Sequence, residues 1–275
     1  MTETYIHGFS EAEQERLVHQ ARVLAPHVFG GIDFSDVRTV LEIGCAVGAE
    51  LRVMRERWPH LNLTGLDRSE DQVAAAQRLL AEDIDQGIAH LVQGDAHDLP
   101  LPSGTFDRVI TVWTLEHIPN TETLLREAFR VLADSGKLIL TEVDNETFGF
   151  EPGCEAIGEW WRQFSRCQLD AGGDPYVGRG LAGLARRIGS RDVAEETLRI
   201  IDSRNEPNRR VELLDYLEDL LMSGADAMKQ GGYVDAKLEA EVKADFRRAR
   251  LDADIQFQYH AVRVTCSRPK DLVSS

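Results

Sequence analysis

A chain of 275 residues with 43% hydrophobic and 28% charged residues is long enough for one large domain and has the composition of a globular protein. Its net charge of -16 argues against a nucleic-acid partner, because phosphate backbones are held by an excess of Lys and Arg. The same charge makes binding to an anionic membrane surface unfavourable, and it is compatible with a neutral or cationic small substrate.

The start of the chain and its cysteines bear on its location. The first residues, MTETYIHGFSEAEQERL, carry acids where a signal peptide would have an apolar core. No stretch approaches the roughly 18 apolar residues of a membrane span. Four cysteines (Cys45, Cys154, Cys167 and Cys266) form no C-x-x-C pair and no zinc-ligand pattern. We therefore expect a cytoplasmic protein with free thiols, no metal site and no membrane association.

Helical and strand patterns alternate along the first half of the chain. Ser10 and Glu13 form a capping box that predicts a helix over about residues 10–24. Strands are predicted at 38–43, 61–67, 89–93, 106–112 and 137–143, and a second capping box at Ser69 and Gln72 starts one of the intervening helices. This alternation is typical of a parallel sheet that is covered by helices on both faces.

After residue 145 the pattern changes. A helix over 154–169 contains several aromatic residues, and it is followed by the loop AGGDPYVGRG, a short helix and a strand near 197–202. Helices at about 207–229 and 235–250 precede a last strand near 254–266. We interpret these two helices as an insertion between the final two strands.

The stretch VLEIGCAVGAE, at residues 40–50, is the most informative motif. Gly44, Ala46 and Gly48 lie two residues apart, a spacing that lets the backbone approach a ligand closely, as in nucleotide-binding turns. In doubly wound sheets ligands bind beyond the carboxyl ends of the strands, where this turn lies. A dinucleotide would place its pyrophosphate there, and Glu42 would repel it. S-adenosylmethionine carries an ammonium and a sulfonium instead, so Glu42 favours this ligand, directly or through water.

Two acids further along agree with a nucleoside ligand. Asp67 ends the second strand, where its carboxylate can accept hydrogen bonds from both ribose hydroxyls; dinucleotide-binding folds use an acid at the same place. In VQGDAHDLPL, Asp95 can accept from an adenine amino group, with Ala96 donating its backbone N–H.

Taken together, these segments resemble a known family. VLEIGCAVG, LTGLD, QGDAHDLPL, FDRVITVWTLEHI and GKLILTEVD are similar to class I S-adenosylmethionine-dependent methyltransferases of the ubiquinone/menaquinone-methyltransferase-like, small-molecule group, over about residues 36–145. YIHGFSEAEQERLVHQA and GGDPYVGRGLAGLA are more loosely similar to a subgroup with an N-terminal lid helix. The family usually has Gly where this chain has Ala46, a change that we expect to be tolerated.

The resemblance implies a Rossmann-like, doubly wound α/β fold. Its sheet would have seven mostly parallel strands with the last one antiparallel, an N-terminal lid helix, and a helical insertion between the final strands. We expect a single domain over residues 1–275, divided into a lid segment (1–35), a cofactor-binding core (36–145), a substrate-side insertion (146–253) and a final strand (254–266).

The resemblance also identifies candidate site residues. Those expected to hold the cofactor are Glu42, Gly44, Cys45, Ala46, Gly48, Asp67, Arg68, Gly94, Asp95, Ala96 and Trp113. Those expected to contact the substrate are Tyr5, Glu116, Asn145, Trp160, Tyr176 and Arg179, and His7 and Gln20 belong to the segment that would close over the cofactor. His117 is the candidate catalytic base, with capping of the next helix as its structural alternative.

Methyl transfer from a sulfonium mainly requires alignment of the acceptor and exclusion of water, so it leaves almost no fixed catalytic motif. We therefore expect an S-adenosylmethionine-dependent methyltransferase that acts on a small molecule, most readily at nitrogen or oxygen, with carbon or sulfur acceptors also compatible. A homodimer is compatible with the sequence. Two alternatives stay open: an NAD-dependent oxidoreductase, and a protein that binds S-adenosylmethionine but catalyses a non-methylating reaction.

Overall fold

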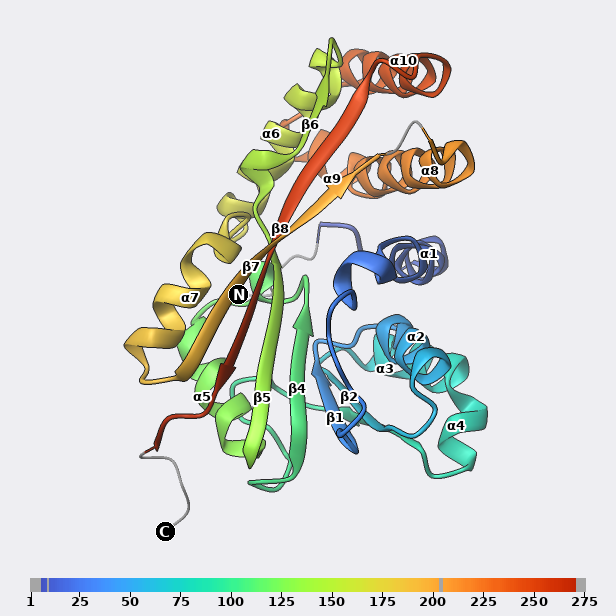
Figure 1. Ribbon diagram of the computed structural model, residues 1–275. Helices are drawn as coiled ribbons and strands as arrows, with labels where there is room; N and C mark the ends of the chain where they lie inside the picture. Colours follow the sequence, from blue (N-terminus) through green and yellow to red (C-terminus); the bar gives the residue numbers. More distant parts are fainter. Residues whose placement is uncertain (1–5, 9, 203–204, 271–275) are drawn as a thin grey trace.

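An eight-stranded sheet forms the centre of the computed structural model, which describes residues 6–8, 10–202 and 205–270 (Figure 1). Its order is β3-β2-β1-β4-β5-β8-β6, and β7 also pairs with β8. The strands are β1 (Thr39–Ile43), β2 (Asn62–Asp67), β3 (Ala89–Gln93), β4 (Phe106–Val112), β5 (Leu132–Val143), β6 (Gly149–Glu151), β7 (Arg191–Ile201) and β8 (Gln256–Ser267).

The pairing pattern confirms the predicted fold class. Strands β1 to β5 pair in parallel, whereas β8 runs antiparallel to β5, β6 and β7. From β1 the chain builds outward through β2 to β3, then returns to the other side of β1 with β4. The strand order therefore reverses between β1 and β4, which is where doubly wound sheets bind ligands.

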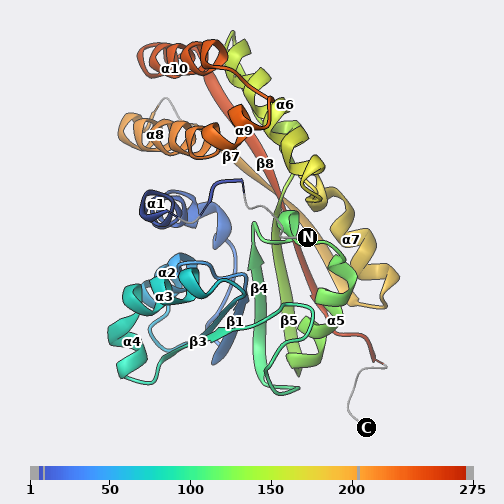
Figure 2. The same cartoon turned by 180° about the vertical axis from the view of Figure 1, so that it is seen from behind.

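Helices cover both faces of this sheet. Figures 1 and 2 show α2, α3 and α4 on one face, and α5 and α7 on the other. Ser10 and Ser69 cap α1 and α3 by accepting hydrogen bonds from the backbone N–H of Glu13 and Gln72, as the capping boxes predict. The α-helices are α1 (Glu11–Val28), α2 (Ala49–Arg57), α3 (Glu70–Leu79), α4 (Ala81–Asp85), α5 (Thr121–Val131), α6 (Glu155–Asp170), α7 (Val177–Arg187), α8 (Pro207–Ser223), α9 (Ala225–Gln230) and α10 (Ala236–Leu251), and two single-turn 3-10 helices are η1 (Leu115–His117) and η2 (Asn145–Thr147).

The structure starts β5 at Leu132 and β7 at Arg191, earlier than the sequence predicts, and it differs in two further details. The sheet has an eighth strand, β6, because Gly149–Glu151 pair with the start of β8. A strand of three residues is too short to show an alternation of apolar and polar residues in the sequence. The single helix predicted over 207–229 is instead two helices, α8 and α9, which meet at Gly224. A Cβ at Gly224 would lie 3.0 Å from Ile6 Cγ2, so glycine lets the N-terminal segment pack against this junction.

The helices of the second half form a lid over the carboxyl edge of the sheet. Strands β7 and β8 extend beyond the end of β5, and α6, α8, α9 and α10 gather around their outer parts (Figure 1). Asp245 of α10 accepts hydrogen bonds from the backbone N–H of Ala156 and Ile157 at the start of α6. Helix α1 packs between α2 of the core and α8 of the lid, so it joins the two layers.

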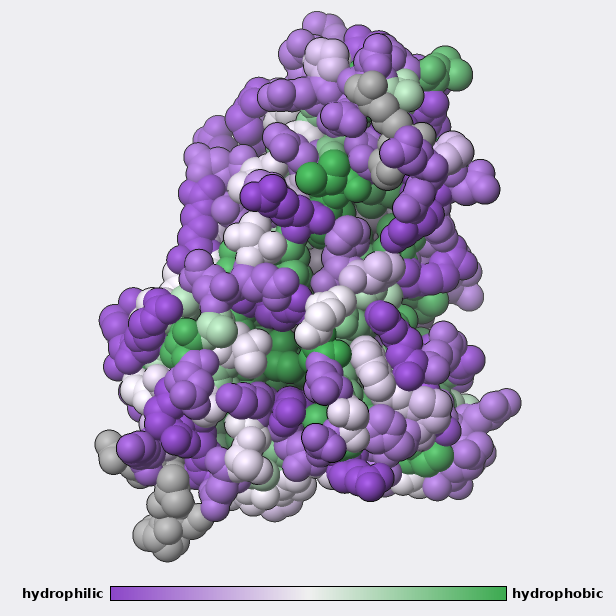
Figure 3. Space-filling view, in the orientation of Figure 1, coloured by the Kyte–Doolittle hydropathy of each residue, from purple (hydrophilic) through white to green (hydrophobic). Residues whose placement is uncertain are grey.

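The surface in the view of Figure 3 is mostly hydrophilic, and apolar side chains show mainly in its recesses. Within the part of the chain that the structure describes, no helix combines the length and apolar character needed to cross a membrane. The same residues contain no cluster of three or more His, Cys, Asp and Glu side chains that could hold a metal ion. All four cysteines are free thiols.

Candidate active site

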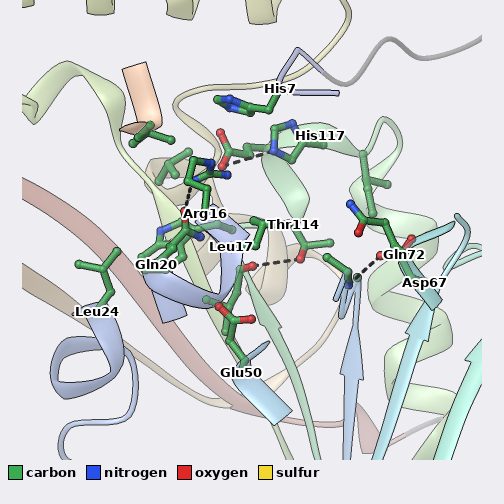
Figure 4. Close-up of a pocket in the computed structure, with 18 of the residues that line it drawn as sticks. His7, Arg16, Leu17, Gln20, Leu24, Glu50, Asp67, Gln72, Thr114 and His117 are labelled. Carbon is green, nitrogen blue, oxygen red and sulfur yellow. Dashed lines mark hydrogen bonds and ion pairs between the residues drawn. The ribbon is translucent and has the colours of Figure 1, made fainter. Parts of the chain in front are cut away.

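A cavity of about 410 Å³ lies at the carboxyl edge of the sheet, between the core and the lid (Figure 4). Its floor is formed by residues at or just beyond the ends of β1, β2, β3, β4 and β5. Its upper wall comes from α1, α6, α8 and β8. The cavity therefore lies at the point where the strand order reverses, and α1, α6, α8 and β8 enclose it from above.

The turn after β1 is shaped for close approach of a ligand. The backbone N–H groups of Gly44 and Cys45 both donate to the Leu66 carbonyl oxygen, at 2.7 and 3.0 Å. Gly44, Ala46 and Gly48 have φ angles of +75°, +43° and +75°, so the turn needs the left-handed region three times. At Ala46 this conformation is strained, because the residue has a Cβ.

Asp67 holds the turns of β1 and β2 together. Its Oδ2 accepts a hydrogen bond from the Ala46 N–H at 3.0 Å, and its Oδ1 accepts from the Ser69 N–H at 2.9 Å. Asp67, Gly44 and Ala46 all line the cavity, as does the neighbouring Arg68. Each carboxylate oxygen keeps a further lone pair, so Asp67 can still accept from the hydroxyls of a bound ribose.

The turn after β3 supplies another part of the floor. Gly94, Asp95 and Ala96 line the cavity, together with His97. Asp95 Oδ1 accepts from the backbone N–H of His97 at 2.8 Å and lies 2.9 Å from its ring Nδ1. These hydrogen bonds lower the pKa of Asp95, so its carboxylate is ionised and fixed in direction.

Three of the residues expected to touch the cofactor do not line the cavity: Glu42, Cys45 and Gly48. Glu42 is only 1% exposed because both faces of β1 are covered by helices. Burial, with the nearby Glu50 and Asp67 carboxylates, raises the pKa of Glu42 well above its ordinary value. Glu42 thus lies outside the lining of the cavity, and its contact with the cofactor, directly or through water, stays a prediction. The Cys45 side chain lies behind the turn, and Gly48 provides the N-cap of α2.

Glu50, in the first turn of α2, is the carboxylate that lines this end of the cavity (Figure 4). Burial raises the pKa of Glu50 to about 7. Glu50 ends the same motif, two residues after Gly48, but a helix position gives no sign from sequence alone of whether a side chain faces a cavity. A carboxylate therefore does line the cavity near the small-residue turn, but it belongs to Glu50 and not to Glu42.

The end of β4 brings a group of titratable residues to the cavity. Trp113 lines it with a φ of +49°, and Glu116 and His117 follow in η1. Glu116 Oε2 accepts from Gln168 Nε2 at 2.6 Å, and Oε1 lies 3.7 Å from His117 Nε2. Burial raises the pKa of Glu116 to about 7, against the opposing effect of the Gln168 hydrogen bond.

Glu142 of β5 supports this group from below. Its Oε1 accepts hydrogen bonds from the Thr114 and Leu115 N–H groups at 3.2 and 3.0 Å and from the Thr111 hydroxyl at 3.1 Å. The carboxyl group is fully buried, which raises its pKa to about 8. Glu142 therefore positions the chain that carries Glu116 and His117.

The upper part of the cavity is an aromatic and aliphatic chamber. Phe148 stacks on Trp161 with ring centroids 4.0 Å apart, and Trp161 stacks on Phe164 at 5.1 Å. Asn145 lies at its edge, accepting from the Tyr259 hydroxyl at 3.1 Å through Oδ1 and from Trp161 Nε1 at 2.9 Å through its backbone oxygen. We define the lid chamber as these residues and the others of the cavity that come from the lid: Asn145, Phe148, Trp161, Phe164, Ile200, Leu213, Tyr216, Leu217, Leu220, Phe257 and Tyr259.

Of the six predicted substrate contacts, Glu116 and Asn145 line the cavity. Trp160 does not, because it lies on the other side of α6, where it is completely buried and donates to the Leu221 carbonyl at 3.1 Å. Tyr176 and Arg179 are also outside the cavity: Arg179 pairs with Asp144 and Glu146 and lies over the Tyr176 ring. Tyr5 is outside the described residues.

Helix α1 and the segment before it contribute residues that sequence reasoning missed or named only in passing. Arg16, Leu17 and Gln20 line the cavity beside Glu50, and His7 lies near His117 (Figure 4). Arg16 donates to both oxygens of Glu13 and to Gln20 Oε1. Their spacing of three and four residues shows that they share a helix face, but polar residues on one face normally indicate solvent.

Comparison with known proteins finds related sequences and folds. Residues 41–140 match the family model Methyltransf_11, described as a methyltransferase domain. Demethylmenaquinone methyltransferase of Thermotoga maritima is 30% identical over 104 residues, which cover 38% of this chain and 43% of that protein. The chain thus matches less than half the length of this curated relative.

Two solved structures share the fold. Phosphoethanolamine N-methyltransferase 2 of Haemonchus contortus, in complex with phosphomonomethylethanolamine and S-adenosylhomocysteine, has a TM-score of 0.59 at 15% identity, covering 94% of this chain and 57% of that one. The cyclase SpnF has a TM-score of 0.53 at 21% identity, covering 93% and 81%. The architecture is the Rossmann-like methyltransferase fold. Residues 41–140 are thus similar in sequence to a methyltransferase domain, and the fold is the one that the solved methyltransferase structures share.

Proposed function

We propose that this protein transfers a methyl group from S-adenosylmethionine to a small-molecule acceptor, at nitrogen or oxygen, by in-line displacement. The observation that carries the proposal is the continuity of one cavity from the Asp67 edge of the sheet to the lid chamber. A cofactor at the edge and an acceptor in the chamber would meet beside Glu116 and His117 without intervening protein.

The residues at the edge fit this cofactor. Asp67 would accept from the ribose hydroxyls, and Asp95 with the backbone of Ala96 would contact the adenine. Glu50 and the Gly44–Ala46 turn line the end suited to the methionyl group, where a carboxylate favours the ammonium and sulfonium cations over a pyrophosphate. The cofactor, when bound, supplies a methyl group that is already attached to a good leaving group.

The protein's own contribution is alignment, exclusion of water and proton removal. The lid chamber is lined mainly by apolar and aromatic side chains, so it separates the acceptor from solvent. An acceptor that carries a proton must lose it, and we place this step at the Glu116–His117 pair. His117 lies 3.7 Å from the buried Glu116 and is 32% exposed at its side chain, so it stands between Glu116 and solvent.

The test is calorimetric titration with S-adenosylhomocysteine, followed by transfer of labelled methyl groups from S-adenosylmethionine to a metabolite library. We expect binding of S-adenosylhomocysteine, no competition by NAD, and a labelled small-molecule product. NAD binding at the same site would instead support the oxidoreductase. The similarity to SpnF, whose name describes a cyclase, gives the non-methylating alternative a specific basis. It predicts cofactor binding with no labelled product from any acceptor.

A further inference from the structure

We propose that the acceptor is an amine on a mainly apolar skeleton, which enters the lid chamber as an ammonium ion and is received by the carboxylate of Glu116. This inference rests on the proposed methyl transfer and narrows it to one acceptor chemistry. It follows from three features of the described residues: the apolar wall, the hydrogen-bonding capacity of the polar groups, and the balance of charge.

The wall of the chamber requires an apolar body. Its stacked rings, Phe148, Trp161 and Phe164, face a cavity that is also lined by the aliphatic side chains of β7 and α8. A ligand with a polar skeleton would find no hydrogen-bond partners against this wall, at a cost in binding free energy. An apolar or aromatic skeleton is stabilised there instead.

Three polar groups around this wall accept hydrogen bonds, and among the described residues the buried Trp113 Nε1 of the same cavity is a donor without a hydrogen-bond partner. The Tyr216 hydroxyl donates its one proton to Gln20 Oε1 at 3.1 Å, and the Tyr259 hydroxyl donates its proton to Asn145 Oδ1 at 3.1 Å. Each hydroxyl oxygen can then only accept from a ligand. Glu116 Oε1 can also accept a hydrogen bond from a ligand, because its distance of 3.7 Å to His117 Nε2 is too long for a hydrogen bond between these two side chains. A reacting group with several N–H donors therefore fits better than a carbonyl or carboxylate.

Charges of both signs lie close to Glu116, so the charge of the acceptor affects the balance. The positive charge of Arg16 acts on Glu116 more strongly than the negative charge of Asp174, but the Arg16 guanidinium is itself paired with both oxygens of Glu13. Burial, followed by the charges of Arg16 and His117, lowers the pKa of His7 well below its ordinary value, so His7 stays neutral near neutral pH. An ammonium would form a neutral pair with the Glu116 carboxylate, whereas a neutral phenol would leave this buried carboxylate with only the Arg16 charge near it.

The proton balance is direct. An N–H bond of the ammonium breaks and its proton passes to Glu116, which becomes a neutral carboxylic acid. The electron pair of that bond stays on nitrogen, so the amine becomes a nucleophile. The buried position of Glu116, which raises its pKa to about 7, makes its carboxylate a stronger proton acceptor than an exposed one. His117 then returns the proton to solvent.

The test compares amines with alcohols of the same skeleton. Phenethylamine and benzylamine, and phenethyl alcohol and benzyl alcohol, are titrated calorimetrically into the full chain saturated with S-adenosylhomocysteine. We expect each amine to bind at least tenfold more tightly than its alcohol. Glu116→Gln should reduce amine affinity at least tenfold and leave alcohol affinity unchanged. Glu195→Gln, which removes an exposed carboxylate of β7, is the matched control and should change neither.

S-adenosylhomocysteine affinity is measured for every variant, because it reports an intact cofactor site. The inference is overturned if no amine binds more tightly than its alcohol, or if Glu116→Gln with normal cofactor affinity leaves amine binding unchanged. Labelled methyl transfer to an alcohol or phenol but to no amine would also overturn it, while leaving the proposed function in place. If the unmodified chain does not bind S-adenosylhomocysteine, the proposed function itself is refuted.

Discussion

Gly44→Ala is the substitution that examines the cofactor turn most directly. Gly44 has a φ of +75°, and a Cβ at this position would lie 2.3 Å from Thr114 Cγ2 and 2.7 Å from Thr114 Oγ1. Both atoms belong to the residue that connects β4 to η1, whose backbone N–H donates to Glu142. The turn and the segment that carries Glu116 would therefore have to move apart.

Gly104 provides a matched control for the backbone part of this effect. Its φ is +69°, and a Cβ there would meet nothing within 4 Å. Forcing a residue with a Cβ into the left-handed region costs about 1–2 kcal/mol at either site. Overpacking at Gly44 adds about 1–3 kcal/mol. We therefore expect the free energy of unfolding to fall by about 1–2 kcal/mol for Gly104→Ala and by about 2–5 kcal/mol for Gly44→Ala.

Urea unfolding measures these values, and titration with S-adenosylhomocysteine measures cofactor affinity. Gly44→Ala should weaken binding at least tenfold, whereas Gly104→Ala should leave it unchanged. Adding Thr114→Ala to Gly44→Ala removes the two closest contacts and leaves one of 3.1 Å to Cβ, so it should restore part of the stability. Equal loss of stability in the two single variants, with unchanged cofactor affinity, would refute this reading of the turn.

Three further predictions follow from the site. Asp67→Asn cannot accept from both Ala46 and Ser69, so it should lower the free energy of unfolding by about 1–3 kcal/mol and weaken S-adenosylhomocysteine binding; unchanged values in both assays would contradict it. Trp160→Phe and Trp161→Phe each lose an indole hydrogen bond, but only Trp161 lines the cavity, so only its variant should alter phenethylamine binding; equal effects of the two would argue against this placement. Between about pH 4.5 and about pH 8, Glu142 keeps a proton in the folded protein but releases it in the unfolded chain, so its contribution to stability falls as the pH rises. Glu142→Gln should therefore flatten the curve of unfolding free energy against pH in this range, and an unchanged slope would count against the raised pKa.

Much of the architecture could be predicted because it depends on local patterns. The alternation of apolar strands with amphipathic helices indicates a parallel sheet whatever the rest of the chain does. Capping by Ser10 and Ser69 depends on residues three positions apart, and the small-residue turn at Gly44 depends on backbone conformation that glycine permits. The predicted nucleoside site at the carboxyl edge of the sheet follows from these local signals and from the strand order.

The lining of the site depended on the tertiary structure. Glu42 and Glu50 lie in the same motif, but the packing of α2 against the sheet puts Glu50 at the cavity and buries Glu42 behind it. Trp160 and Trp161 are adjacent on α6, so a rotation of about 100° between neighbouring helix positions sends one ring into the core and the other into the lid chamber. The helical period shows that adjacent side chains point in different directions. Only the packing of the lid on the core determines which of them lines the cavity.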